Sequence, residues 1–533
     1  MAEQKKYCFC WLKRLSVLLG LICFAAVISG GSFAYGGQLS ASSDPPQPGS
    51  AQPRQVYATD FSLTPFRTSS ESVNEGGSGP MNFSPQQQPF VEPPVRLRDD
   101  DPDYIQKSSP LAVAFKVFSS NAFTWAVDRF VFNYSWARVG FKSWGNNLKS
   151  GWEWDTDRLG MNFFFHPYSG GSYFNSARTS GYSYFASVPF TFLGSLMWEY
   201  FGETTLPAYN DIINTTLSGA LFGEILYRLT SQILDDRTTG TERFFRELAG
   251  AILSPGRALS RLLQGRMARV TPKEIYQKEP LNITLVTGMH WFNTGTTLGS
   301  VGTGGACATF GIHLDYGDPF EIRPRKPFDF FKMRINLSYG KNVGKKYLDN
   351  LIGYGLLFGK TIHSGNLDML VGAFQHYDYW DSHIFEVTSL GFGPGIVAKW
   401  QFSKNSNLQS AFHLEFLPLG ATNSPYIDIV EGGIPGRNYD YSGGAGGKFE
   451  GTLNLGKLGQ ATVIYYVYWL HTYIGPVGDK TIGIFKPRIA VRLYKNLSLG
   501  YEYTFYHKYN NLRDFPDVHR SESEQKFYLM LYF

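Results

Sequence analysis

Apolar and polar residues alternate one by one along most of the C-terminal half of the chain. Between 329 and 340 every second residue is apolar or aromatic: Phe331, Met333, Ile335, Leu337 and Tyr339. The residues between them are polar: Lys332, Arg334, Asn336 and Ser338. Because successive side chains of a strand point to opposite faces, this pattern places one face in an apolar medium and the other in water. It predicts β-strands, and both a soluble sandwich and a membrane barrel would satisfy it.

The alternation recurs in twelve segments, and their length favours a membrane barrel. They lie near 281–292, 304–317, 329–341, 351–363, 367–380, 384–402, 406–420, 443–456, 459–474, 481–495, 497–509 and 524–533. At about 10–16 residues they are longer than ordinary soluble strands and suit strands that cross a bilayer at a tilt. Aromatic residues gather towards segment ends, as in 376–380 and 465–469, which is typical of interfacial girdles. We therefore predict an antiparallel transmembrane β-barrel of about 12 strands over 281–533.

The connections between the segments alternate in length, and this orients the barrel. Short turns follow segments four, six, eight and ten, whereas long loops follow segments one, three, seven and eleven. In outer-membrane barrels the short turns are periplasmic. The long connection 318–328 departs from this rule, which leaves the strand count open by two. The chain ends on Phe533, resembling the terminal strand that outer-membrane proteins present to the barrel-insertion machinery, which we expect to be a partner.

Residues 111–280 show helical rather than strand spacing and form the predicted helical domain. One helix is expected from 184 to 201, which is nearly all apolar but contains Pro189. A second is expected from Asn210 to about Asp235, with Asp211 as its N-terminal cap. Shorter helices are expected on either side of the break at 254–256. The fold class predicted for the whole chain is an α+β membrane protein, with the helical domain followed by the barrel.

The N-terminus carries the features of an export signal. Basic residues precede an apolar run from 15 to 28, and small residues around Ala34 suit cleavage by a signal peptidase. We therefore expect a signal peptide over 1–34, after which one cysteine, Cys307, remains. A stretch rich in Pro, Ser and Gln follows over 35–110 and predicts a disordered linker, because it cannot bury enough surface to fold. Together with the barrel, these features predict the outer membrane of a Gram-negative bacterium.

The composition of the 533-residue chain excludes several classes of protein. Aromatic residues make up 16% and hydrophobic residues 43%, which excludes disorder over the whole chain. The mean hydropathy of −0.20 argues against a bundle of transmembrane helices. A net charge of +5 is too small to indicate nucleic acid as a partner. Outer-membrane lipid is the partner that we expect, and the sequence leaves the oligomeric state open.

Polar residues and glycines recur through the helical domain in a recognisable set. The set begins with His166-Pro167-Tyr168-Ser169-Gly170 and continues with Tyr173, Arg178, Gly181, Trp198, Glu199, Tyr200, Glu203, Asn210, Asp211, Gly219, Gly223, Glu224, Arg228, Ser254 and Pro255. Over about 111–270 the chain thereby resembles the uncharacterised bacterial family catalogued as domain of unknown function 3943. The resemblance implies an envelope location and a recurring polar cluster. It implies no activity, because the family has none assigned.

Seven of these residues form a candidate polar cluster: His166, Arg178, Glu199, Glu203, Asp211, Glu224 and Arg228. In a catalytic interpretation, His166 is a general base and the carboxylates supply acid, base or ligand groups. In a structural interpretation, Arg178 and Arg228 compensate the glutamates between packed helices. We favour the structural interpretation, because no HExxH, CxxC, GxSxG or Walker sequence is present. No cofactor and no metal are expected, and a non-enzymatic protein is favoured over an enzyme. Four glycines are expected to permit close helix contact: Gly170, Gly171, Gly219 and Gly223.

Three functions are compatible with this organisation. The leading interpretation is a channel or transport role, with the helical domain as a plug or gate at the periplasmic side, because apolar helices directly precede the first strand. The second is an envelope enzyme that acts on lipid or lipopolysaccharide through His166, Glu199, Glu203 and Asp211. The third is a structural protein that tethers the membrane to the cell wall through the linker.

The barrel residues themselves leave the state of the lumen open. The water-facing series carries mixed charges, which suits a small polar pore and a packed interior equally well. It includes His313, His413, Glu415, Lys332, Arg334, Arg488, Arg492 and Glu502. Two further histidines, His290 and His471, are expected on the outward series.

Overall fold

A computed structural model describes residues 107–272, 274–294, 305–340, 348–382, 384–430 and 437–533. The predicted signal peptide and nearly all of the predicted linker lie outside these residues. The helical domain comprises α2 (Pro110–Ala126), α3 (Phe141–Lys149), α4 (His166–Arg178), α5 (Tyr184–Phe201), α6 (Tyr209–Ile233), α7 (Gly240–Leu253) and α8 (Pro255–Leu263). Two π-helical turns, η1 (Val127–Val131) and η2 (Met161–Phe165), precede the loop to α3 and the start of α4. Among the described residues, no helix is long and apolar enough to cross a membrane.

Twelve antiparallel strands follow and close into a barrel, which confirms the predicted fold class. They are β1 (Leu281–Thr294), β2 (Ala306–Tyr316), β3 (Phe331–Tyr339), β4 (Leu348–Ser364), β5 (Leu367–Asp381), β6 (Glu386–Ser403), β7 (Ser406–Asn423), β8 (Tyr439–Leu455), β9 (Gly459–Ile474), β10 (Gly478–Tyr494), β11 (Leu497–Leu512) and β12 (Val518–Tyr532). Each strand pairs with its neighbours in sequence, and β1 closes the barrel on β12 in a register that pairs Thr284 with Tyr532. A one-turn helix, α9 (Ile427–Val430), lies between β7 and β8.

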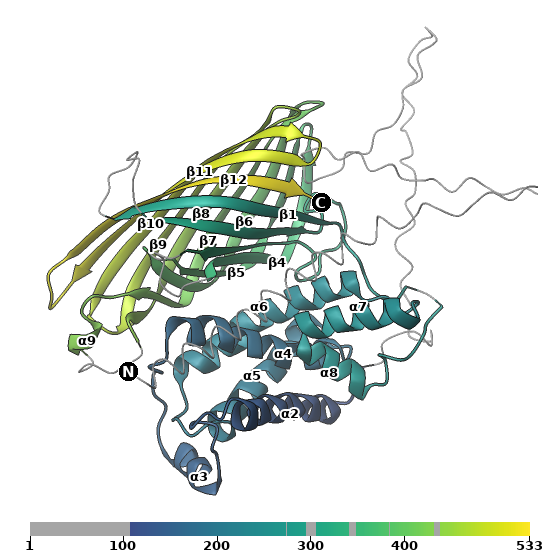
Figure 1. Ribbon diagram of the computed structural model, residues 1–533, viewed down its shortest axis with the longest axis vertical. Coiled ribbons are helices and arrows are strands. Elements are labelled where there is room, and N and C mark those ends of the chain that lie inside the picture. Colours follow the sequence, from purple (N-terminus) through teal and green to yellow (C-terminus); the bar gives the residue numbers. More distant parts are fainter. Residues whose placement is uncertain (1–106, 273, 295–304, 341–347, 383, 431–436) are drawn as a thin grey trace, which may run out of the picture.

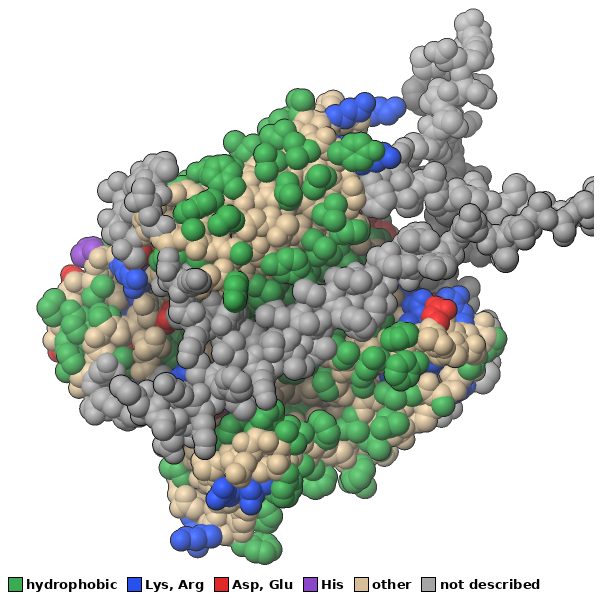
Figure 2. All heavy atoms as spheres, viewed as in Figure 1, with side chains coloured by type: hydrophobic (Ala, Val, Ile, Leu, Met, Phe, Trp, Pro, Cys, Tyr) green, Lys and Arg blue, Asp and Glu red, His purple; other side chains and the backbone are tan. Residues whose placement is uncertain are grey.

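The outer face of the barrel is apolar, as a membrane wall requires. On β7, Phe412, Leu414 and Phe416 are about half exposed, and the same holds for Ile489, Val491 and Leu493 on β10. Figure 2 shows such apolar side chains spread over the barrel wall. A closed barrel with this surface is the architecture of an outer-membrane protein.

The lumen of the barrel is filled by its own side chains rather than lined as an open pore. Opposite charges pair inside it: Lys448 Nζ lies 2.5 Å from Asp378 and 3.0 Å from Glu415, and Arg488 lies 2.5 Å from Glu502, its partner on the adjacent strand. A buried apolar cluster packs beside these pairs and includes Trp380, Tyr466, Tyr468, Leu470, Ile482, Ile484 and Tyr506. A cavity between Lys332 and Glu450 offers about 30 Å³, which is room for water but not for a solute.

One histidine faces differently from its expected direction. His290 was expected on the outward series of its strand, but it is buried and its Nδ1 contacts Glu524. The outward position is taken by its neighbour Met289, which is 47% exposed. Both series of β1 carry apolar residues, so the alternation does not distinguish the two faces there. His471 is half exposed and lies 2.8 Å from Asp479.

The helical domain lies against the outside of the barrel wall, with α6 contacting β5, β6 and β7 (Figure 1). On β5 the exposed Val371 marks the outward series, to which Gln375 and Tyr377 also belong, whereas Asp378 pairs with Lys448 in the lumen. The Gln375 side chain donates to the carbonyl of Leu217 at 2.8 Å, and the hydroxyl of Tyr377 donates to the backbone carbonyl of Phe163 in η2. The described helices therefore do not plug the lumen, and the expectation of a plug is corrected in this respect.

The helix α6 runs along the wall from one end of the barrel towards the other. Near its C-terminus, Arg228 donates to the carbonyl of Pro327 at 2.6 Å, in the turn between β2 and β3. Towards its N-terminus, Asn214 donates to the carbonyl of Asn162 in η2, and Asn162 in turn donates to the hydroxyls of Tyr439 and Tyr441 at 2.8 and 2.7 Å, where β8 begins. The turn at Pro327 lies at the end of the barrel that carries the short turns and both of its termini, so the start of α6 lies towards the opposite end. By the turn rule, that opposite end is extracellular.

Close contact between α4 and α6 depends on glycine, as the sequence predicts. A Cβ at Gly219 would lie 2.6 Å from the Cα of Gly170, and a Cβ at Gly171 would lie 3.2 Å from the backbone nitrogen of Gly223. Such distances are shorter than side chains tolerate, so any larger residue would push the two helices apart. The pair of helices therefore holds the start of α4 and the start of α6 in a fixed relation.

Candidate functional site

Three helix ends meet at the extracellular end of the helical domain. His166 is the first residue of α4, Glu199 lies near the end of α5, and Asp211 lies in the first turn of α6. The segment before η2 closes over them, because Glu153 pairs in parallel with Ala208 and the amide of Asp155 donates to Asn210 at 2.9 Å. Asp211 was expected to cap α6, but the cap position is Ala208, so its carboxylate is free to turn inwards.

His166, Glu199 and Asp211 converge on one point. One ligand atom of each lies within 4.8 Å of the others. Nε2 of His166 is 3.6 Å from Oδ1 of Asp211. The Glu199 side chain is fully buried; its Oε2 accepts the amide of Ala208 at 2.9 Å, and its Oε1 has no hydrogen-bond partner. The imidazole retains 16% exposure and is the accessible edge of the group.

Burial and neighbouring carboxyl groups shift the pKa values of all three side chains. Burial raises the pKa of Glu199 to about 8, against the amide of Ala208, which lowers it. Burial, then the neighbouring carboxylates of Asp155 and Glu199, raise the pKa of Asp211 well above its ordinary value. Burial lowers the pKa of His166 to about 4, so its imidazole is neutral at physiological pH. Neutral imidazole and crowded carboxylates are features of functional sites more often than of structural ion pairs.

The candidate cluster of seven residues divides into two groups. Arg178 donates two hydrogen bonds to the buried carboxylate of Glu224, at 2.7 and 3.1 Å, and Arg228 donates a third at 2.9 Å. The structural interpretation had these two arginines compensate Glu199, Glu203 or Glu224. They compensate Glu224, because they lie about three to five turns further along the helices than His166 and Asp211. The triad is structural, and Arg228 also links it to the barrel.

Glu203 lies near His166, Glu199 and Asp211, but its carboxyl group is not among the ligand atoms that lie within 4.8 Å of one another. It lies just after the end of α5, and its carbonyl accepts the side chain of Asn147 at 3.1 Å. Burial, followed by the charges of Glu199 and Asp155, raises the pKa of its carboxyl well above the usual range. Glu203 thus adds a further carboxyl group beside His166, Glu199 and Asp211; we call these three residues the acidic–histidine site.

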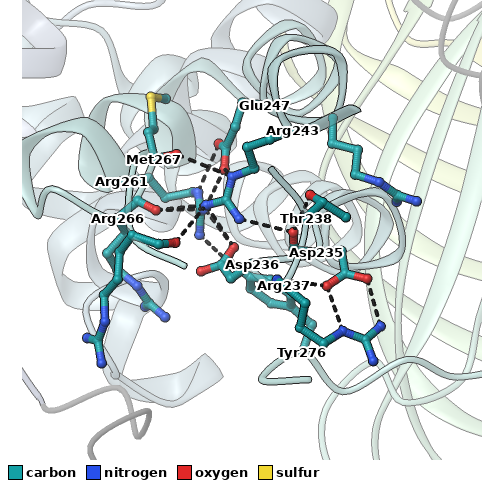
Figure 3. A network of polar contacts seen from close by, with 12 residues as sticks. Asp235, Asp236, Arg237, Thr238, Arg243, Glu247, Arg261, Arg266, Met267 and Tyr276 are labelled. Carbon is teal, nitrogen blue, oxygen red and sulfur yellow. Dashed lines mark hydrogen bonds and ion pairs between the residues drawn. The ribbon is translucent and has the colours of Figure 1, made fainter. Parts of the chain in front are cut away.

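A separate polar network holds the far end of the helical domain together (Figure 3). The buried Arg261 of α8 donates to Asp236 at 2.9 Å and to Glu247 of α7 at 2.6 Å. Arg243 lies 3.2 Å from Asp236 and 2.9 Å from Glu247, so two cations face two anions. Tyr276, just before β1, donates to Asp236 at 2.8 Å. This balanced network ties α7 and α8 to the segment that enters the barrel and has no unmatched group to offer a ligand.

Sequence reasoning did not identify several residues that complete the acidic–histidine site. Asp155 and Asp157 add charge from the segment before η2, and their carbonyls accept the hydroxyls of Tyr441 and Tyr439 at 3.0 and 2.8 Å. Thr215 lies one turn after Asp211, and its hydroxyl is 3.2 Å from Nδ1 of His166. The sequence signal that could have pointed to these residues is the acidic residue at every second position, at 153, 155 and 157. Extended loop segments show the same spacing, so it does not by itself indicate a site.

Comparison with known proteins agrees with this division of the chain. Residues 151–256 match the family model described as Domain of unknown function (DUF3943), as the sequence resemblance predicts. No curated protein matches the chain. Similar solved structures include the NanC porin, at 9% identity and a TM-score of 0.24 over 47% of this chain and 99% of that chain. The outer membrane channel DcaP of Acinetobacter baumannii is 8% identical, with a TM-score of 0.22 over 48% of this chain and 96% of that chain. An anion-selective porin from Comamonas acidovorans is 9% identical, with a TM-score of 0.21 over 48% of this chain and 99% of that chain. The chain thus joins a helical domain that matches DUF3943 to a twelve-stranded outer-membrane β-barrel.

Proposed function

We propose that the protein is an outer-membrane enzyme that acts on lipid, with the barrel as its anchor and the acidic–histidine site as its reactive centre. The observation that carries this proposal is the convergence of His166, Glu199 and Asp211 in a domain docked on the lipid-facing wall. The arginines that would have made the cluster structural are bound to Glu224 instead. A group of acceptors without a matching cation is a costly arrangement to keep for stability alone.

The surface of the helical domain supports lipid as the substrate. Large apolar side chains stand exposed on its outer helices and loops: Leu111, Phe115, Phe118, Phe123, Phe130, Phe141, Phe185 and Phe192. Figure 2 shows apolar side chains gathered over the helices and over the barrel wall. Exposed apolar surface on this scale marks a membrane or partner contact. Because it continues a wall that faces lipid, the contact we assign to it is outer-membrane lipid.

The packed lumen supports an anchoring role for the barrel. Lys448, Asp378 and Glu415 neutralise each other inside it, and an apolar cluster around Trp380 and Tyr468 fills the space beside them. A barrel in this state conducts poorly, yet it fixes a docked domain at a defined depth in the membrane. The chemistry then belongs to the helical domain.

Turnover of lipid by the purified full chain tests the proposal. The protein is reconstituted with phospholipid or with lipopolysaccharide, and products are identified by mass spectrometry. We expect hydrolysis products with the native chain and their loss with Glu199→Gln and Asp211→Asn. The matched control is Glu242→Gln, an exposed carboxylate of α7 that should leave turnover unchanged. Unchanged lipids with the native chain, or turnover that survives both buried substitutions in folded protein, would contradict the proposal.

A channel or transport role is the second candidate, and the barrel fold itself favours it. The lumen carries charged pairs along its length, among them Arg334 with Asp315 at 2.6 Å and Lys526 with Glu524 at 3.1 Å. Charged rings of this kind line selective pores when the packing opens. Single-channel conductance of the full chain in planar bilayers, with and without residues 111–270, separates the candidates: only a channel gives discrete openings. The tether interpretation concerns residues outside the described part of the chain and stays a prediction.

A further inference from the structure

The acidic–histidine site brings together an imidazole and two carboxyl groups, and among the described residues no arginine or lysine contacts them. Nδ1 of His166 lies 3.2 Å from the hydroxyl of Thr215, which can accept the ring proton at Nδ1; Nε2 is then an acceptor. That Nε2 faces Oδ1 of Asp211 at 3.6 Å. The buried Oε1 of Glu199 has no hydrogen-bond partner. When both carboxyl groups are ionised they repel each other, so the site is stable with protons on them or with a cation among them.

The spacing suits a metal ion in the middle. Two ligands at about 2.1 Å from Zn²⁺ lie about 3.4 Å apart at a tetrahedral angle. The 3.6 Å between His166 and Asp211 is close to that value, and all three ligand atoms fall within 4.8 Å. A change in the side-chain torsions of Glu199 would bring the third ligand closer to the other two.

The charge of the ligands and the contacts behind them agree with a divalent ion. A metal ion displaces the protons of Glu199 and Asp211, and the two carboxylates with a neutral imidazole then carry a charge of −2, which one divalent cation neutralises. The outer hydrogen bonds are of the kind that orient metal ligands: Asn210 donates to Asp211 at 2.8 Å, and the amide of Ala208 donates to Glu199 at 2.9 Å. One imidazole with two carboxylates suits Zn²⁺ or Mn²⁺ better than Ca²⁺, which takes six to eight oxygens.

A buried histidine and carboxylate group in the lumen is, by contrast, already compensated. In the lumen, His376 lies 3.3 Å from Glu415, but Lys448 lies 3.0 Å from the same carboxylate and occupies the place of a cation. The acidic–histidine site has no such lysine among its described contacts. The arginines of α4 and α6, Arg178 and Arg228, are bound to Glu224.

We propose that His166, Glu199 and Asp211 bind one divalent transition-metal ion of the Zn²⁺ or Mn²⁺ type. The inference extends the proposed function, because a bound cation of this kind lowers the pKa of a coordinated water and supplies a nucleophile for hydrolysis. The ion lies at the edge where His166 retains exposure, which is where a substrate would reach it. Metal binding is measurable without any substrate, and its outcome is therefore separate from that of lipid turnover.

The test uses the full chain, purified in detergent without an affinity tag and treated with a chelator. Binding of Zn²⁺ and Mn²⁺ is followed by calorimetry and by metal analysis after dialysis, and Co²⁺ is added as a spectroscopic probe. We expect one metal per chain and a visible Co²⁺ absorption band, with no comparable binding of Ca²⁺. In Glu199→Gln and Asp211→Asn the stoichiometry falls to zero and the Co²⁺ band disappears, whereas Glu242→Gln keeps both.

A milder variant keeps the inference testable if the variants of the metal ligands do not fold. Thr215→Val has nearly the same shape as the native residue and removes only the hydroxyl that orients His166. We expect its metal affinity to fall about 10- to 100-fold while its thermal unfolding in the chelated form stays unchanged. Absence of binding by the folded native chain, or one bound metal that persists in all three variants, would overturn the inference. Metal binding without lipid turnover would retain it and reject the proposed function.

Discussion

Nε2 of His166, at the start of α4, lies 3.6 Å from Oδ1 of Asp211, in the first turn of α6. The relationship is set by the packing of the two helices and not by any local sequence motif. It joins residues that are 45 positions apart in the chain, so whatever separates α4 from α6 also opens the site. The predictions below follow from this dependence of the site on the fold around it.

Gly219→Ala should open the site from a distance. The added methyl would lie 2.6 Å from the Cα of Gly170, and overpacking of this kind costs about 1–3 kcal/mol. We expect a lower unfolding temperature of the helical domain and weaker metal binding, measured by circular dichroism and calorimetry. Gly145→Ala is the control: nothing lies within 4 Å of it, and alanine favours the helix. Equal stability of the two variants would argue against close glycine packing.

The hydroxyls of Tyr439 and Tyr441 should hold the helical domain on the barrel. Replacing both with Phe leaves the buried Asn162 amide without acceptors, at a cost of about 1–3 kcal/mol for each lost bond. We expect faster proteolytic release of the helical domain while the barrel keeps its heat-resistant mobility on gels. Tyr465→Phe, on the outward face of β9, should change neither property. Unaltered release from the double variant would show that these bonds do not carry the docking.

Arg261→Met should destabilise the far end of the helical domain. The guanidinium is buried between Asp236 and Glu247, and removing one partner of a buried ion network costs about 3–5 kcal/mol. Chemical denaturation followed by tryptophan fluorescence measures the change. Arg138→Met removes an exposed arginine and should cost less than about 1 kcal/mol. Similar midpoints for the two variants would mean that the network in Figure 3 adds little stability.

Asp235 should make the helical domain sensitive to acid. Hydrogen bonds from Arg237 lower the pKa of this carboxyl to about 2 from 3.8 in the unfolded chain. A depressed pKa contributes stability above the unfolded value, and that contribution is lost as the pH falls from about 4 towards 2. Asp235→Asn removes the contribution at every pH. The difference in unfolding temperature between native and variant chains should therefore shrink over this range, and a constant difference would contradict the assignment.

The strands were predictable because the outward face of a membrane barrel is apolar and the inward face is polar, so apolar and polar residues alternate along each strand. Phe331, Met333 and Ile335 alternate with Lys332 and Arg334, and β3 runs through these residues as expected. What alternation cannot reveal is which apolar medium an outward residue meets. Tyr377 belongs to a stretch that resembles an interfacial girdle, yet it contacts the helical domain instead of lipid.

The candidate site was only partly predictable for a similar reason. The sequence identifies His166, Glu199 and Asp211 as candidates, because polar residues among apolar helices need a partner. It does not show which partners they have, since Arg178 and Arg228 are equally near in sequence to several carboxylates. The separation into a structural triad and an acidic–histidine site depends on how α4 and α6 are aligned along each other, which only the folded structure shows.

Cross-linking tests most directly the central claim, that the helical domain lies on the outer wall and leaves the lumen to the barrel. The ring of Phe222 on α6 lies 5.1 Å from the ring of Tyr377 on the outward face of β5. In a chain carrying Phe222→Cys and Tyr377→Cys, a short bis-maleimide should join the two positions in intact outer membranes. A pair of Phe222→Cys with Asp378→Cys, whose native side chain faces the lumen, should not react. Cross-linking to the lumen position, or to neither position in folded protein, would contradict the claim.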